Sequence, residues 1–115
     1  MKRVQSARQQ VNAMKRIIRK DANTIETILD DDGKMCALGG LAHYGAGVSL
    51  RTLKWWNAEC RVNAMAFAAA CDAFPLLTKR NLTAASIYDI NDRYPTSLAE
   101  RRQALCRFLD SLLED

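Results

Sequence analysis

Apolar residues recur along most of this chain at intervals of three and four, the spacing that places side chains on one side of an α-helix. The segment 3–20 shows this spacing at Val4, Val11, Met14 and Ile18, and no proline or glycine interrupts it. We therefore predict a helix over 3–20. Its first turns are rich in glutamine and have little to bury, so we expect them to project while the second half packs.

The middle of the chain predicts two further helices. Ser49 can cap one of them, and of the adjacent tryptophans Trp55 and Trp56 we expect one in the core and the other partly exposed. The alanine-rich segment Asn57–Phe74 is predicted to be the central buried helix, because alanine favours helix and permits close packing. Pro75 should end it at about Phe74.

The last third of the chain predicts a short helix and a long one. Thr83 can cap a helix over Ala84–Ile90, and the polar pair Asn91–Asp92 is expected to end it as a cap and turn. A final helix is predicted over Ser97–Leu113. Its first residues form a capping box, in which Ser97 and Glu100 satisfy each other's backbone N–H groups.

A glycine-rich stretch, Asp30–Gly47, is the most unusual part of the chain. A helix is predicted from about Met35 to the glycines at 45–47, and one of its faces is made of small or polar residues, namely Cys36, Gly39, Gly40 and His43. Glycine inside a helix costs roughly 1 kcal/mol relative to alanine. Two adjacent glycines therefore indicate close approach of another backbone or a ligand, and a homodimer through this face is one form of that approach.

The segment before this helix has two interpretations. Its β-branched residues favour an extended piece that turns at Asp32–Gly33 and returns through Lys34–Met35, because Asp-Gly suits a tight two-residue turn. Alternatively, the first helix continues to Leu29. We favour a minimal β-hairpin or extended piece near residues 24–35.

These elements predict an all-α fold, a single domain of four to five packed helices. The chain of 115 residues, 49% of them hydrophobic, is long enough to bury a core. No apolar run reaches the roughly 18 residues that a membrane span needs, so no membrane partner is expected. The basic start lacks the apolar segment of a secretory signal, which favours a cytoplasmic location, in a bacterium or in the host cell of a phage.

Charge divides the chain unevenly. Seven of the 17 basic residues precede Asp21, the first of the 13 acidic residues, so the net charge of +4 arises from a basic segment attached to a mildly acidic remainder. We accordingly expect two parts, a basic N-terminal helix or arm at 1–20 and a compact helical domain at 21–115. A binding surface for an acidic partner is predicted from Arg3, Arg8, Lys15, Arg16, Arg19 and Lys20, extended by Lys79, Arg80, Arg101 and Arg102.

Catalytic and metal chemistry finds little support in the sequence. Cys36, His43 and Asp92 are the ingredients of a cysteine hydrolase, but seven residues of helix separate the thiol from the imidazole by roughly 10 Å. The four cysteines, Cys36, Cys60, Cys71 and Cys106, form no C-x-x-C pair and are expected as buried reduced thiols. We predict no metal site, no cofactor and no enzymatic activity, and keep the hydrolase as an alternative.

Two stretches carry a resemblance to a known group. The first is Asp31-Asp-Gly33 followed by Cys36-Ala-Leu-Gly-Gly-Leu-Ala42, and the second runs from Leu82-Thr-Ala-Ala-Ser-Ile87 through Asn91–Asp92 to a capped helix with Arg101–Arg102. Together they resemble small uncharacterised bacterial and phage proteins with a D-G-x-x-C-A-x-G-[AG]-L segment. This chain lacks the upstream tryptophan and cysteine that such proteins often have. The resemblance implies a phage or mobile-element origin. The basic start of this chain lies outside the two matching stretches.

The function expected from these features is binding without catalysis. The basic segment would dock on an acidic surface, either a protein that handles nucleic acid or nucleic acid itself. In a phage setting, an inhibitor of a host defence complex would fit. Direct nucleic-acid binding through the first helix is the main alternative, although no helix-turn-helix pattern is recognisable.

Overall fold

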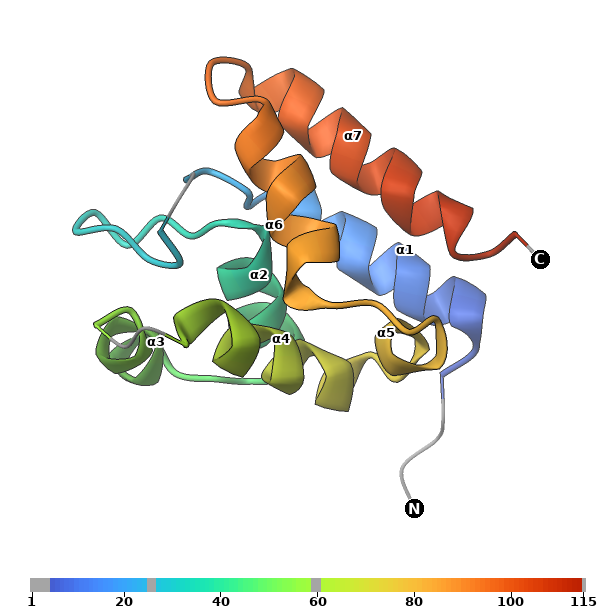
Figure 1. Cartoon of the computed structure of the whole chain (residues 1–115), viewed down its shortest axis with the longest axis horizontal. Coiled ribbons are helices and arrows are strands. Elements are labelled where there is room, and N and C mark those ends of the chain that lie inside the picture. Colours follow the sequence, from blue (N-terminus) through green and yellow to red (C-terminus); the bar gives the residue numbers. More distant parts are fainter. Residues whose placement is uncertain (1–4, 25–26, 59–60, 115) are drawn as a thin grey trace.

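The computed structural model describes residues 5–24, 27–58 and 61–114, and within these ranges it is built from helices with no strand (Figure 1). The all-α prediction is confirmed. The part of the chain described has seven α-helices instead of four to five, because two of them are single turns. The elements are α1 (Ala7–Ile18), α2 (Ala37–Gly40), the π-helical turn η1 (Leu41–Gly45), α3 (Leu50–Trp56), α4 (Val62–Ala73), α5 (Leu76–Lys79), α6 (Ala84–Arg93) and α7 (Leu98–Ser111).

Helix α1 belongs to the packed body of the protein. It begins with a capping box, in which Ser6 Oγ accepts from Gln9 N–H and Gln9 Oε1 accepts from Ser6 N–H. Its apolar side buries Val11, Met14 and Ile18 against α7, η1 and α2. The basic segment from Ala7 onward is therefore part of the compact domain and not an arm beside it. The predicted contributions of Val4 and Arg3 lie outside the described residues.

The centre of the fold is the continuous helical segment α2–η1. Every residue from Ala37 to Ala42 is buried, and this segment contacts α1, α4 and α6 (Figure 1). The prediction that Asn57–Phe74 would be the central helix was wrong. Helix α4 starts only at Val62 and buries just Ala66 and Ala70. Its other alanines are not buried, because so small a side chain can lie at the surface at little cost.

The two adjacent glycines of α2 allow close approach of other parts of the chain, the backbone of Ile28 at Gly39 and the side chain of Asp21 at Gly40. A Cβ on Gly39 would lie 2.5 Å from the carbonyl oxygen of Ile28, and a Cβ on Gly40 would lie 2.9 Å from Cβ of Asp21. Close backbone approach at this face is thus confirmed. The neighbours are segments of the same chain, and they bury both glycines, so the close approach at this face gives no support to a homodimer.

A minimal hairpin precedes α2. Leu29 and Met35 form an isolated antiparallel bridge, and Asp30 N–H donates to Lys34 O at 2.9 Å. Gly33 N–H donates to Asp30 O, and Gly33 has a φ of +81°, so the connection is a three-residue loop with a left-handed glycine instead of the expected two-residue turn. The alternative in which the first helix reaches Leu29 is wrong, since α1 ends at Ile18.

Helix α6 runs through the polar pair that was expected to end it. It continues past Asn91 to Arg93, and Asn91 is 1% exposed. The Asn91 side chain accepts from Ala37 N–H at 3.0 Å and donates to Thr24 O at 2.9 Å. Asn91 therefore caps the start of α2, a different helix, instead of the end of its own.

None of the helices in the described ranges has the length and apolar character needed to cross a membrane.

Candidate binding face and cavity

Four basic residues lie exposed along one side of α1: Arg8, Arg16, Arg19 and Lys20. At 3.6 residues per turn they fall within an arc of about 120°. Arg19 and Lys20 come after Ile18, the last residue of the helix, but Lys20 and Asp21 both donate their N–H groups to Ile17 O, so a further turn continues through them. We call these four residues the α1 basic stripe. No acidic residue precedes Asp21, so no carboxylate on α1 neutralises the stripe.

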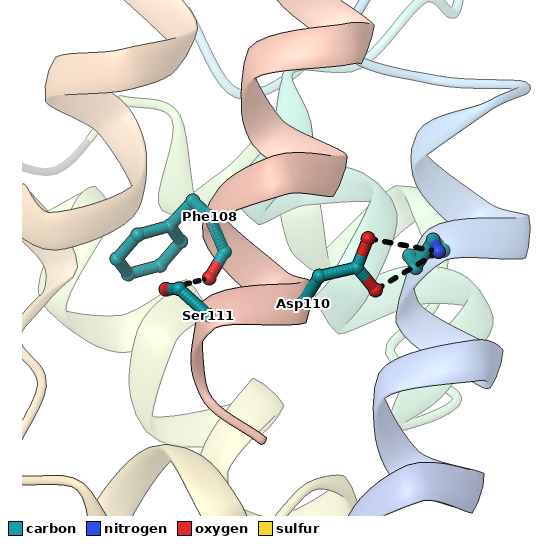
Figure 2. Close-up of polar contacts among 4 residues, drawn as sticks. Phe108, Asp110 and Ser111 are labelled. Atoms are coloured by element: carbon teal, nitrogen blue, oxygen red, sulfur yellow. Dashed lines mark hydrogen bonds and ion pairs between the residues drawn. The ribbon is translucent and has the colours of Figure 1, made fainter. Parts of the chain in front are cut away.

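Lys15 belongs to the interior side of this region. Its Nζ lies 2.9 Å from Asp110 Oδ1 of α7, and its side chain is only 18% exposed (Figure 2). This ion pair joins α1 to α7. Close to it on α7, Ser111 Oγ donates to Phe108 O within the last turn. Lys15 was predicted as a partner contact, and its ion pair instead makes it a link within the fold.

Arg101 was also predicted to contact a partner, and it is buried instead. The residue is 4% exposed, and its guanidinium donates to the backbone oxygens of Ala22, Tyr94 and Pro95. Ala22 has a φ of +63°, a left-handed conformation that costs an alanine roughly 1–2 kcal/mol. The bond from Arg101 Nη1 to Ala22 O, 2.5 Å long, holds this strained residue in place.

Arg102 acts on the same turn from the next position of α7. Its Nε donates to Asp21 O at 2.9 Å, and its Nη2 donates to Lys20 O and to Asn23 Oδ1. The two adjacent arginines thus clamp the turn 20–23 onto α7, which corrects their assignment as partner contacts. The sequence alone does not show which arginine side chains turn inward to bond to backbone carbonyl groups. For this reason Arg101 and Arg102 were predicted to be partner contacts.

The remaining predicted contacts lie elsewhere. Lys79 and Arg80 are exposed at the end of α5, a separate element from the stripe. Arg3 lies outside the described residues. Of the predicted partner contacts within the described residues, the structure therefore brings together the four of the α1 basic stripe and places Lys79 and Arg80 on a different element.

A cavity of about 520 Å³ lies beside the stripe, between α1, η1 and the end of α4. Its lining includes Arg16, Lys20 and Asp21 from the first helix and turn, with Tyr44 and Phe74 opposite. Tyr44 is 61% exposed at its edge, whereas Phe74 is buried. The volume falls within the range of ordinary small-molecule sites.

Asp21 is the chemically unusual member of this lining. The residue is 5% exposed, and among the described residues its Oδ2 finds no hydrogen-bond partner. Burial raises the pKa of the Asp21 carboxyl above its usual value, although the charges of Arg102, His43 and Lys20 oppose the rise. Sequence reasoning missed Asp21, Tyr44 and Phe74. The available signal was that Asp21 continues the helical row of Ala13 and Ile17 at intervals of four.

The residues considered for a cysteine hydrolase have structural roles. Cys36 caps α2, with its Sγ accepting from Gly39 N–H at 3.4 Å, and burial raises the pKa of its thiol to about 11. His43 Nδ1 lies 2.6 Å from Val48 O, which fixes a proton on that nitrogen, because a carbonyl can only accept. Asp92 Oδ1 accepts from the Asn91 amide. The thiol and the imidazole thus each bond to a different backbone group, the thiol to Gly39 N–H and the imidazole to Val48 O.

The other cysteines differ from the expectation of four buried thiols. Cys71 and Cys106 are half-buried, and Cys60 lies outside the described residues. Within the described ranges, no group of three or more His, Cys, Asp or Glu side chains is placed to hold a metal ion.

A second exposed patch lies on α3, well apart from α1 (Figure 1). Trp55 is 63% exposed and Leu50 44%. Trp55 is the exposed tryptophan that was expected, but Trp56 is only half-buried and packs against the core instead of lying within it. Arg51 and Lys54 are exposed on the same helix. They line a second cavity, of about 500 Å³, together with Asp30 and Asp31, so acidic groups offset their charge.

Comparison with known proteins finds no matching family model, no matching curated protein and no matching solved structure. The resemblance of the D-G-x-x-C segment to small phage and bacterial proteins therefore stays a prediction.

Proposed function

We propose that this protein is a non-catalytic binding protein that docks on an acidic surface of another protein through the α1 basic stripe. The observation that carries this proposal is the exposure of four bases on one side of a helix that holds no acid. The packing of α1 supports it further. Val11, Met14 and Ile18 anchor the helix in the core, so the stripe is presented on a fixed scaffold and little ordering entropy is lost on binding.

The chemistry beside the stripe favours a protein partner over nucleic acid. A phosphate backbone places negative charges at close, regular intervals, and binding it favours an uninterrupted basic surface. Here the carboxylate of Asp21 and the apolar walls of the cavity adjoin Arg16 and Lys20. Exposed Tyr44 at the cavity edge adds an aromatic ring, a residue type enriched at protein interfaces. Inhibition of a host complex that handles nucleic acid is one form this binding would take in a phage-encoded protein.

The test is capture of a partner from nuclease-treated bacterial lysate by tagged wild-type protein and two matched variants. Arg16→Glu/Lys20→Glu reverses two charges of the stripe. Arg51→Glu/Lys54→Glu makes the same chemical change on α3. We expect one protein to be captured by wild type and by the α3 variant, and to be lost with the α1 variant.

Direct nucleic-acid binding is the second candidate, and the α1 basic stripe is the feature that favours it. Recovery of nucleic acid alone from untreated lysate, and of nothing after nuclease treatment, would replace the protein partner with this function. Such binding should weaken steeply with salt, and the slope should fall in the α1 variant by about the number of phosphate contacts removed. Undiminished protein capture by the α1 variant would contradict the docking surface itself.

A further inference from the structure

The cavity beside α1 combines groups of opposite charge in a defined order. The row Ala13, Ile17 and Asp21 follows one line along the helix at intervals of four, and the row Arg16 and Lys20 runs next to it. The first row is apolar and ends in a buried carboxylate. The second row is exposed and basic. The cavity is therefore acidic at an interior point and basic at its outer edge.

One oxygen of the buried carboxylate, Asp21 Oδ2, finds no hydrogen-bond donor in the part of the chain that the structure describes. Buried polar atoms in folded proteins nearly always have hydrogen-bond partners, and an unpaired one is costly. Arg102 approaches Asp21 but donates to its backbone oxygen. The Asp21 side chain packs against Gly40, where any Cβ would lie 3.2 Å from Oδ2, so this oxygen lies against α2. Asp21 also belongs to the lining of the cavity, so a donor bound there can approach the carboxylate.

The apolar part of the lining fits a hydrophobic group. Phe74 and Tyr44 supply aromatic rings from opposite the helix, and Ile17 supplies an aliphatic side chain. The ring of Phe74 closes against Gly45, which has no side chain to displace it. A ligand for this cavity thus needs a cationic donor for Asp21, an anion for Arg16 and Lys20, and an apolar body.

We propose that the cavity is a binding site for an apolar α-amino acid, with the ligand's ammonium on Asp21 and its carboxylate on Arg16 and Lys20. The charge order of the two rows and the buried carboxylate of Asp21 in the same lining carry this assignment. The site needs no macromolecular partner, but it shares Arg16 and Lys20 with the α1 basic stripe, so a docked partner and this ligand would compete for the two bases. The ligand's side chain lies between Phe74, Tyr44 and Ile17.

Three related compounds test the assignment on the wild-type chain by NMR titration. L-Phenylalanine carries both charged groups, 2-phenylethylamine only the amine and 3-phenylpropanoate only the carboxylate. We expect saturable shifts at the backbone amides of the cavity residues with phenylalanine, and affinities at least about tenfold weaker with the other two. Absence of saturable shifts with phenylalanine up to about 10 mM would overturn the site, as would equal affinity for all three compounds.

Two variants then locate the two charges. Asp21→Asn should weaken phenylalanine and phenylethylamine by about tenfold or more and leave phenylpropanoate unchanged. Arg16→Gln/Lys20→Gln should weaken phenylalanine and phenylpropanoate and leave phenylethylamine unchanged. The opposite pattern, or no change in either variant, would overturn the assignment. Because the three-compound comparison uses wild-type protein, a variant that failed to fold would not remove the test.

Discussion

Arg101 of α7 donates from Nη1 to the backbone oxygen of Ala22, a residue held in a left-handed conformation. This bond connects positions 79 residues apart and fixes the turn that carries Asp21 and Lys20. A cation that looked like a contact for a partner thus shapes the cavity and the end of the α1 basic stripe.

Replacing Arg101 with methionine should destabilise the protein. Methionine keeps the apolar stem but leaves the oxygens of Ala22, Tyr94 and Pro95 without their shared donor, and we expect a loss of at least about 2 kcal/mol in the free energy of unfolding. Urea unfolding measures it. Arg107→Met on the exposed side of the same helix is the control and should change stability by less than about 0.5 kcal/mol. Equal stability of the two variants would contradict the clamp.

Asn91 is predicted to be a principal polar residue of the core. In Asn91→Ala, the N–H of Ala37 and the oxygen of Thr24 lose their partners, at a cost of about 3 kcal/mol. Asn12→Ala, on the exposed side of α1, should be neutral or slightly stabilising, since alanine is the better helix former. Thermal unfolding of both variants compares them, and a neutral Asn91→Ala would remove the capping role.

Gly39 tests the packing of α2 against the hairpin. A methyl group there meets the Ile28 carbonyl, which cannot retreat without breaking its bond to Cys36 N–H, so Gly39→Ala should cost about 3 kcal/mol. Gly47→Ala meets no neighbour, and only its φ of +77° opposes it, so we expect about 1 kcal/mol. The ratio of the two losses, measured by chemical unfolding, is the test. A smaller loss at Gly39 than at Gly47 would be incompatible with the packing.

The buried carboxyl of Asp21 should make part of the stability depend on pH in an unusual direction. Its pKa is raised in the folded protein above the ordinary value of 3.8, against the opposing charges of Arg102, His43 and Lys20. Between the two pKa values the folded state binds more protons than the unfolded state, so this group's contribution to stability rises as pH falls.

The difference between wild type and Asp21→Asn isolates this contribution from that of the other carboxyls. We expect the variant to be the more stable protein at pH 7 and its advantage to shrink as the pH is lowered toward 4. Urea unfolding at several pH values measures the difference. An advantage that grows on acidification, or a pH-independent difference, would show that burial does not govern this carboxyl.

Cys36 is predicted to be unreactive in the folded protein. With a thiol pKa of about 11, only about one molecule in a thousand carries the thiolate at pH 8, and the sulfur is also buried. Iodoacetamide should therefore label the half-buried Cys71 well before Cys36, and both at similar rates in urea. Mass spectrometry of the peptides follows the labelling. Preferential labelling of Cys36 in the native protein would instead support a nucleophilic role.

The elements with local signals were predictable from the sequence. The caps at Ser49 and Ser97, the hairpin before α2 and the close approach at Gly39–Gly40 all follow from residue types a few positions apart. The exposed bases of α1 were predictable in the same way, because no acidic residue precedes Asp21 in the sequence.

The features that depend on distant pairs were not predictable. In its local sequence, Asn91 is typical of a helix end. Only the fold brings it next to Ala37, 54 positions away. The cavity is made by three separate segments, so no single stretch of sequence signals it. The centre of the fold was misplaced because an alanine-rich helix has no clear apolar side, and small residues are tolerated both inside and outside.

The most direct test of the docking surface is lysine acetylation of the wild-type protein, free and in its captured complex. Lys20 belongs to the α1 basic stripe, and Lys54 is an equally exposed lysine on α3. We predict that the partner protects Lys20 from acetylation and leaves Lys54 as reactive as in the free protein. Protection of Lys54 with Lys20 still reactive would contradict docking through α1 and would assign the interface to the α3 patch around Trp55.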